Sequence, residues 1–342
     1  MKHYLFYIAH NYDFEILRPL QQEILRRGDD VAWFVEGKEF NPDYFHQHER
    51  VLDNINQVVD YNPRAVFTPS NLVPLFIPGI KVQVFHGFEW KKKGHLKIRG
   101  CFDLYCTQGP FFTQKFNQLK TRHPHFSVIE TGWPKVDSLF NAQAYTWPSQ
   151  RSVKTILYAP TFSPALTSAE ALYEEISRLS KDQKWQWIIK FHPKMDSLWV
   201  KKYQNLCSEN LHIAETDSLA PILQSADLIV SDTSSIITEF GLLNKPIITL
   251  NNRAPEEHLL NITQASYLEE TIIQALKAEG NLLKLIKLNM QQMHPYSDGA
   301  SSARVLDAAE KIIQSPPTEL KAKPYNLIRK LKMRKKLNYW KL

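Results

Sequence analysis

The feature that most constrains the fold is the alternation of short apolar runs with longer stretches whose apolar residues recur at helical spacing. The apolar runs predict strands at 4–9, 31–35, 65–68, 82–85, 103–107, 127–130, 155–158, 187–191, 211–214, 227–230 and 247–250. The helical spacing predicts helices at 15–27, 169–179, 197–207, 218–224 and 234–243, and a mostly helical run at 264–309. Strands that alternate with helices form parallel sheets, so we expect an α/β fold.

The length of 342 residues indicates two domains, at roughly 150 residues per domain. A polar segment without periodicity, 141–154, separates two similar halves and predicts a linker. We therefore expect an N-terminal domain over 1–145, a C-terminal domain over 146–316 and a tail over 317–342. Two such halves are expected to face a cleft, with ligands at the carboxyl ends of the strands.

Composition excludes several classes of protein. Hydrophobic residues make up 43% and charged residues 23% of the chain, which argues against disordered and fibrous proteins. No apolar run approaches the ~18–20 residues needed to span a bilayer, and the N-terminus meets polar residues too soon for a signal peptide. Three cysteines, an odd number, predict reduced thiols and a cytoplasmic location.

The net charge of +7 resides in the C-terminal tail. Residues 321–342 contain nine Lys or Arg and no acid, which leaves 33 basic and 35 acidic groups, a net of −2, in the other 320 residues. A nucleic-acid-binding domain normally carries its positive face on the folded body. The sequence therefore predicts no nucleic-acid partner.

The strongest local motif is ADLIVSDTSSIITEFGLLNKPIITL, over 226–250. A buried strand ends at Asp232, and Thr233, Ser234 and Ser235 open a predicted helix whose free N–H groups favour a bound phosphate. Glu239 lies one turn further on, within reach of a ribose. An equally good interpretation is that these polar residues only cap the helix.

Two histidines follow apolar strands. His192, in WIIKFHPK, is held by the following proline at a strand end, and the flanking Lys190 and Lys194 favour an anion site, although a structural histidine is more common. His86, in VFHGFEWKKKG, precedes Gly87, where a backbone can approach a ligand closely. Lys91 belongs to a basic run, which is more commonly just a solvated turn.

Weaker signals are Thr161, at the end of YAPT, and Asp298, in DGASS. The histidine pairs at 46–48 and 123–125 and the cysteines lack a metal-ligand pattern, so no metal is expected.

Taken in order, HG…KKKG, TGWPKVDSL, ILYAPTF, KFHP, ADLIVSDTSSIITEFGLLNKPII and DGASSARV resemble the CDP-glycerol glycerophosphotransferase family, over roughly residues 82–306. These enzymes make teichoic-acid-type and capsular poly(alditol phosphate) polymers. The resemblance implies a glycosyltransferase-B-like fold, with two Rossmann-like domains and a nucleotide-donor site in the C-terminal one. It implies no cofactor and no metal for donor binding.

The resemblance also implies roles for individual residues. His86 would be the general base on the acceptor hydroxyl, and His192 would contact the donor pyrophosphate. Ser234 and Ser235 fall where the family holds phosphate, and Glu239 falls where related enzymes hold ribose. The donor site expected from these matches contains Thr161, Lys190, Asp232, Thr233, Ser234, Ser235, Glu239 and Asp298, while Gly87 and Lys91 are expected at the acceptor or its loop.

The leading hypothesis is a transferase that moves a glycerol-phosphate or related unit from a CDP donor to a lipid-linked or polymeric acceptor. Phe162 and Ser163 stand where the family usually has Trp-Arg, which keeps open a glycosyltransferase that uses a nucleotide sugar. A third hypothesis is a non-catalytic protein that binds membrane surfaces. Basic, Trp- and Tyr-containing residues 325–342 predict peripheral association with anionic lipid on the inner face of the cell membrane, or a disordered solubilising tail.

Overall fold

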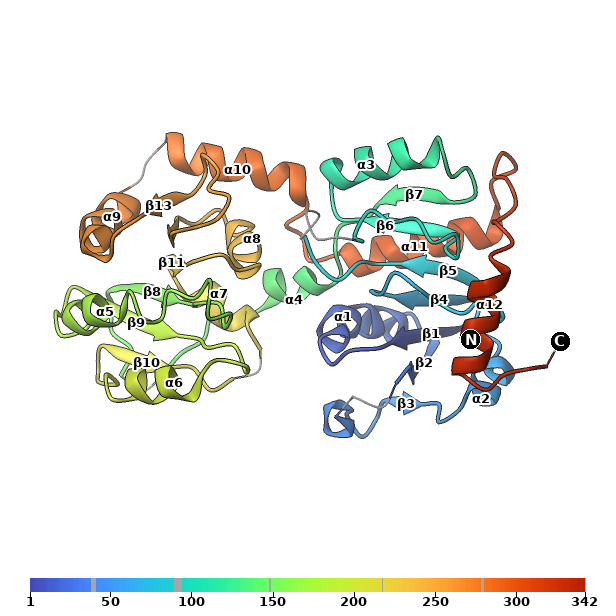
Figure 1. Ribbon diagram of the computed structural model, residues 1–342, viewed down its shortest axis with the longest axis horizontal. Coiled ribbons are helices and arrows are strands. Elements are labelled where there is room, and N and C mark those ends of the chain that lie inside the picture. Colours follow the sequence, from blue (N-terminus) through green and yellow to red (C-terminus); the bar gives the residue numbers. More distant parts are fainter. Residues whose placement is uncertain (38–40, 89–93, 148, 217, 278–279, 342) are drawn as a thin grey trace. The chain divides into compact units, whose positions relative to one another are not determined.

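The computed structural model describes residues 1–37, 41–88, 94–147, 149–216, 218–277 and 280–341. The chain divides into two compact units. Unit 1 contains Met1–Ser138 and Gln292–Leu342, and unit 2 contains Leu139–Gln291. Each unit is built on a parallel sheet with helices packed against it (Figure 1).

The sheet of unit 1 has seven strands in the order β3-β2-β1-β4-β5-β6-β7. They are β1 (His3–Ile8), β2 (Asp30–Val35), β3 (Arg50–Val51), β4 (Ala65–Thr68), β5 (Ile80–Gln83), β6 (Leu104–Thr107) and β7 (Ser127–Glu130). Every pairing is parallel, and the order reverses beside β1, which places a topological switch between β1 and β4. The six predicted strands of this half are confirmed, and the two-residue β3 was not predicted.

The helices of unit 1 are α1 (Asp13–Arg26), α2 (Ile55–Tyr61), α3 (Pro110–Lys120), the start of α4 (Lys135–Asn141), α11 (Ser301–Gln314) and α12 (Leu327–Lys336), with the short 3₁₀ helix η1 (Pro42–Tyr44). α11 packs against α1, β5 and β6. Residues of α2, α3 and the C-terminal segment pack with strand residues in one apolar cluster, which includes Val58, Phe116 and Tyr339.

The sheet of unit 2 has six parallel strands in the order β10-β9-β8-β11-β12-β13. They are β8 (Lys154–Tyr158), β9 (Trp185–Ile189), β10 (Leu211–Ile213), β11 (Leu228–Ser231), β12 (Ile247–Leu250) and β13 (Leu260–Ile262). The helices are α5 (Tyr173–Leu179), α6 (Ser197–Gln204), α7 (Ala220–Ser225), α8 (Ile236–Gly241), α9 (Leu268–Leu276), α10 (Asn281–Met293) and the 3₁₀ helix η2 (Ala265–Tyr267). The predicted parallel α/β organisation is confirmed in both units.

The C-terminal part of the chain lies in unit 1, which differs from the predicted domain boundary at residue 316. The carboxylate of Asp137 accepts hydrogen bonds from the backbone N–H groups of Ser301 (2.8 Å) and Ser302 (2.7 Å) at the start of α11. Further along α11, Glu310 accepts hydrogen bonds from the Tyr4 hydroxyl (2.7 Å) and the Lys2 ammonium (2.8 Å). These contacts hold α11 to the first half of the chain.

The predicted tail contains a helix and packs on unit 1. Met333 of α12 and Tyr339 are buried, and the Tyr339 ring stacks on Phe76 with centroids 4.6 Å apart. The Lys323 ammonium pairs with Asp103 at 2.7 Å. A fully disordered tail is therefore the wrong interpretation for this segment. Among the described residues, none of the helices combines the length and apolarity needed to cross a membrane.

Candidate active site

His86 follows β5 at the carboxyl edge of the unit 1 sheet and is exposed. The residue before it, Phe85, has a backbone φ of 60°, in the left-handed region. A bulky aromatic residue adopts this conformation at a cost of about 1–3 kcal/mol, and such strain clusters at functional sites. The rest of the fold therefore holds Phe85 in a backbone conformation that the residue itself disfavours, and this conformation sets the position of His86.

The surroundings of Phe85 explain how the strain is held. Its carbonyl accepts a hydrogen bond from the Trp133 indole N–H at 3.1 Å, and its ring stacks on His95 at 5.4 Å. The backbone N–H of Trp133 in turn donates to Nε2 of His294 at 3.0 Å. Burial lowers the pKa of His294 to about 4, so the ring stays neutral and keeps this acceptor.

Other side chains gather around His86. The Tyr12 ring lies 6.5 Å from the His86 ring and stacks on His10 at 5.0 Å, and the His95 ring lies 5.6 Å from the His86 ring. Burial raises the pKa of Tyr12 to about 12, so its hydroxyl keeps its proton at neutral pH. Sequence reasoning missed His10 and Tyr12, although their place just after the first strand is a usable signal.

The other two residues predicted near the acceptor have different outcomes. The carbonyl of Gly87 accepts a hydrogen bond from the buried Gln108 amide at 2.8 Å, which fixes the backbone immediately after His86. Lys91 lies outside the described residues.

His192 follows β9 in unit 2 and is also exposed. The backbone N–H of Lys194 donates to Nδ1 of His192 at 3.0 Å, so in the neutral ring the proton sits on Nε2. The ring stacks on Phe162 with centroids 4.3 Å apart. Partial burial, Lys194 and Lys190 all lower the pKa of His192. The side chain is therefore a neutral, oriented N–H donor at neutral pH.

The carboxylate of Asp232 is buried at the end of β11 and is occupied by donors from the protein. It accepts hydrogen bonds from the N–H groups of Thr161 (3.0 Å), Ser168 (2.9 Å) and Thr233 (2.7 Å), and from the Ser168 hydroxyl (3.0 Å). Burial raises its pKa, against the effect of these donors. Asp232 thus ties the loop that carries Thr161 to β11.

The remaining donor-site candidates of unit 2 lie after β11 and β9. The predicted helix begins later than expected, because α8 starts at Ile236 and has six residues. The hydroxyl of Thr233 accepts from the N–H of Arg253 at 3.3 Å. Within the described chain the hydroxyls of Ser234 and Ser235 form no hydrogen bond, whereas Glu239 is buried on α8.

Two predicted donor-site residues interact elsewhere in the protein. The Lys190 ammonium donates to the Thr216 carbonyl at 2.6 Å. Asp298 lies in unit 1, where its carboxylate accepts two hydrogen bonds from Arg304, at 2.8 and 3.0 Å. Arg304 lowers the pKa of Asp298. Asp298 therefore belongs to unit 1, in the turn before α11.

No cluster of three His, Cys, Asp or Glu residues suited to a metal occurs in the described part of the chain. Two doubly wound parallel units define a glycosyltransferase-B-like fold. The fold resembles that of the wall teichoic acid polymerase TagF, with a TM-score of 0.64 at 14% identity over 92% of this chain and 89% of that one. A UDP-N-acetylglucosamine 2-epimerase is similar as well, with a TM-score of 0.60 at 15% identity over 95% and 100% of the two chains.

Sequence comparison finds relatives in one family. Residues 96–254 match the family described as CDP-glycerol:poly(glycerophosphate) glycerophosphotransferase. The teichoic acid glycerol-phosphate primase of Bacillus subtilis is 30% identical over 47% of this chain and 44% of its own length. The teichoic acid poly(ribitol-phosphate) polymerase of Bacillus spizizenii is 27% identical over 53% of this chain and 33% of its own length. The chain thus spans less than half of these relatives.

Proposed function

We propose that the protein transfers a glycerol-phosphate or related alditol-phosphate unit from a CDP-activated donor to an acceptor hydroxyl, in the synthesis of a cell-surface polymer. The observation that carries this proposal is the family match over 96–254, which includes the KFHP motif and its oriented His192. The acceptor would be lipid-linked or polymeric. The proposed chemistry needs no redox cofactor.

In the proposed reaction, the acceptor oxygen forms a bond to the donor phosphorus nearest the alditol. The bond from that phosphorus to the bridging oxygen breaks, and CMP leaves with that oxygen. His86 accepts the proton of the attacking hydroxyl. The Nε2–H of His192 donates to the phosphate oxygens on which charge develops.

The other proposed donor contacts follow from the family motifs that these residues match. The hydroxyls and backbone N–H groups of Ser234 and Ser235 would hold phosphate oxygens, with Thr161 and Thr233 beside them. Lys190 would add positive charge, and Glu239 would contact the ribose. Asp232 supports this set by fixing the Thr161 loop.

The test is CMP release from CDP-glycerol with a short glycerol-phosphate oligomer as acceptor. His86→Ala is expected to lower turnover by ~10²–10⁴-fold and leave nucleotide affinity nearly unchanged. His192→Ala is expected to lower turnover by ~10²–10³-fold. His48→Ala, on an exposed loop of unit 1, is the matched control and should behave like the wild type. Retention of most activity by His86→Ala would contradict the general-base role.

A second test separates the donor classes. Transfer of an alditol phosphate releases CMP, whereas a glycosyltransferase releases a nucleoside diphosphate from its nucleotide sugar. The cognate nucleotide at 100 times its Kd should stabilise the protein by about 2.7 kcal/mol, so a thermal-shift panel of CMP, CDP, UDP and GDP identifies the base. Unchanged CDP affinity in the Ser234→Ala, Ser235→Ala double variant would refute the phosphate contacts.

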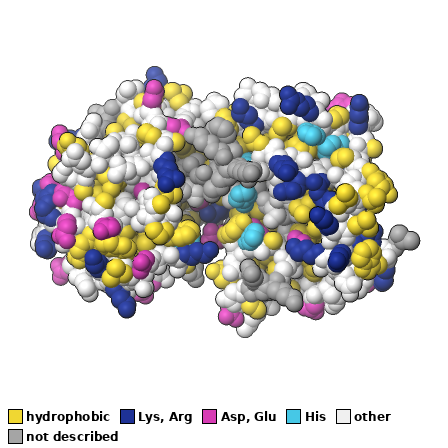
Figure 2. Space-filling model, in the orientation of Figure 1, with side chains coloured by type: hydrophobic (Ala, Val, Ile, Leu, Met, Phe, Trp, Pro, Cys, Tyr) yellow, Lys and Arg dark blue, Asp and Glu magenta, His cyan; other side chains and the backbone are white. Residues whose placement is uncertain are grey.

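We also propose that the protein works at the inner face of the cell membrane and contacts anionic lipid through α12 and the residues that follow it. Tyr325, Ile328 and Trp340 are 71%, 73% and 56% exposed, respectively. In Figure 2 the surface over this segment mixes Lys and Arg with hydrophobic side chains. Such a face suits the boundary between headgroups and acyl chains.

Vesicle sedimentation tests the membrane contact. Full-length protein should bind vesicles that contain phosphatidylglycerol at low salt, and much less at high salt or with neutral vesicles. Ile328→Glu should weaken this binding, and Tyr267→Glu, an exposed residue of unit 2, should not. If full-length protein ignores anionic vesicles at low salt, the membrane contact is refuted.

A further inference from the structure

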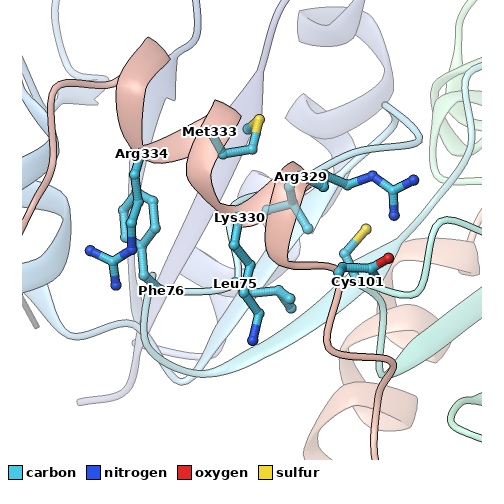
Figure 3. Close-up of a pocket in the computed structure, with 9 residues that line it drawn as sticks. Leu75, Phe76, Cys101, Arg329, Lys330, Met333 and Arg334 are labelled. Atoms are coloured by element: carbon cyan, nitrogen blue, oxygen red, sulfur yellow. The ribbon is translucent and has the colours of Figure 1, made fainter.

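A cavity of about 160 Å³ lies in unit 1 between α12 and the connection from β4 to β5. We call it the α12 pocket. Its apolar lining includes Val73, Leu75, Phe76 and Met333, and Cys101 closes another side. Figure 3 shows Leu75, Phe76 and Cys101 facing the residues of α12. An apolar cavity of this volume has room for a group the size of benzene.

The walls of the α12 pocket are held by specific contacts. The Phe76 ring stacks on the Tyr339 ring, with centroids 4.6 Å apart, and the Arg334 guanidinium lies 5.0 Å from the centroid of the Phe76 ring. At the start of α12, the Asn326 amide and the Arg329 guanidinium both donate to the Arg99 carbonyl. These contacts tie both ends of the helix to unit 1, so the pocket is part of the folded structure.

The polar part of the lining is positive. Arg329, Lys330 and Arg334 line the pocket together with Asn326, and all are half-buried. In the described part of the chain, the ion pairs of residues 317–342 involve Glu319, Lys323 and Lys336, and none involves these three cations. Cations without a carboxylate beside an apolar cavity complement a molecule that has an anionic head and an apolar chain.

We propose that the α12 pocket binds the phosphate head of an anionic membrane lipid, with the first carbons of its apolar chain inside the cavity. The cavity holds only a short part of such a chain, and the exposed apolar residues Ile328 and Leu331 provide a path for the rest. This inference rests on the proposed membrane contact and adds a defined lipid site to it. The lining contains neither His86 nor His192, so the site is distinct from the candidate active site.

Binding of dodecyl phosphate, used below its micelle concentration with full-length protein, tests the proposal by calorimetry. Two comparison probes are used. Inorganic phosphate has the anionic group without an alkyl chain, and dodecyl maltoside has the alkyl chain without a charge. The wild type should bind dodecyl phosphate at least about tenfold more tightly than either. Equal binding of inorganic phosphate would overturn the lipid site in favour of a simple anion site, and absence of dodecyl phosphate binding would overturn the site altogether.

Matched charge reversals locate the site. Lys330→Glu removes a cation from the pocket, while Lys332→Glu makes the same charge change on the exposed side of α12. Lys330→Glu should weaken dodecyl phosphate binding by about tenfold or more, and Lys332→Glu should leave it nearly unchanged. An equal loss in both variants would refute the pocket in favour of general surface charge.

A second variant and two further assays distinguish the lipid site from the proposed transferase activity and from the proposed membrane contact. Leu75→Trp should fill the cavity and block the alkyl chain without changing charge, and melting curves without probe report whether it folds. CMP release with the soluble acceptor should be unchanged in Lys330→Glu, so failure of the lipid site leaves the transferase assay intact. Loss of vesicle binding in Ile328→Glu with retained dodecyl phosphate binding would separate membrane contact from pocket occupancy.

Discussion

Replacement of His294 by glutamine tests the connection between the strained backbone at His86 and the buried residues behind it. His294 is 4% exposed, and its Nε2 accepts the N–H of Trp133 at 3.0 Å. Protonation would turn this acceptor into a second donor facing the Trp133 N–H. The folded protein therefore excludes the charged ring, and burial lowers the pKa of His294 from 6.5 to about 4.

The magnitude follows from linkage between protonation and folding. Between pH 6.5 and pH 4 the unfolded chain binds a proton at His294 that the folded chain does not, so the folded state loses stability as pH falls. For a pKa of 6.5 in the unfolded chain and about 4 in the fold, the free energy of unfolding drops by about 2 kcal/mol between pH 7 and pH 5 from this residue alone. Glutamine does not titrate, so the free energy of unfolding of His294→Gln does not include this drop of about 2 kcal/mol between pH 7 and pH 5.

The assay is urea unfolding at both pH values, followed by hydrogen exchange in peptides from β5 and β6 so that unit 1 is reported. At pH 7 the variant should be less stable by about 1–3 kcal/mol, because the Trp133 N–H loses its best acceptor. At pH 5 the difference between wild type and variant should shrink by about 2 kcal/mol. A difference that is the same at both pH values would refute a neutral, buried His294.

Three further predictions concern other buried groups. Asp232→Ala should lower the free energy of unfolding of unit 2 by about 3–5 kcal/mol in urea titrations, because several buried donors lose their acceptor. Glu310→Gln should destabilise α11 by only about 1 kcal/mol in hydrogen exchange, because its cationic partners are partly exposed. In the native protein, a thiol reagent should modify the exposed Cys207 and leave the buried Cys101 and Cys106 unmodified until urea is added.

The sequence was sufficient to predict both parallel sheets, because strands buried on two faces appear as short continuous apolar runs. It was also sufficient to place His86 and His192 just after strands, although each strand ends two residues earlier than predicted. The strands that were not predicted are β3, with two residues, and β13, with three. Elements this short have no periodicity to detect, and they form because an existing sheet edge offers them hydrogen-bonding partners.

The return of the chain to unit 1 could not be predicted from local pattern. The apolar spacing of α11 is the same whichever sheet the helix covers. Contacts with residues far away in sequence determine which sheet α11 covers. One of these residues is Asp137, which lies 164 residues from the Ser301 N–H group that it binds. The same holds for the C-terminal segment, whose basic residues are conspicuous while its buried anchors, Met333 and Tyr339, are ordinary in sequence.

These long-range contacts give the TGWP and DGASS motifs a shared physical role. Gly132 has a φ of 82°, and a side chain there would lie 2.4 Å from the Ser301 hydroxyl and 2.8 Å from Nε2 of His294. The two motifs therefore pack so closely that only glycine fits between them. Through Trp133 they reach the Phe85 carbonyl and hold its strained conformation. The strain at Phe85 costs about 1–3 kcal/mol. Loss of one buried hydrogen bond in this series of contacts costs a similar amount, about 1–3 kcal/mol. Removal of one such bond is therefore enough to release the strained backbone that positions His86.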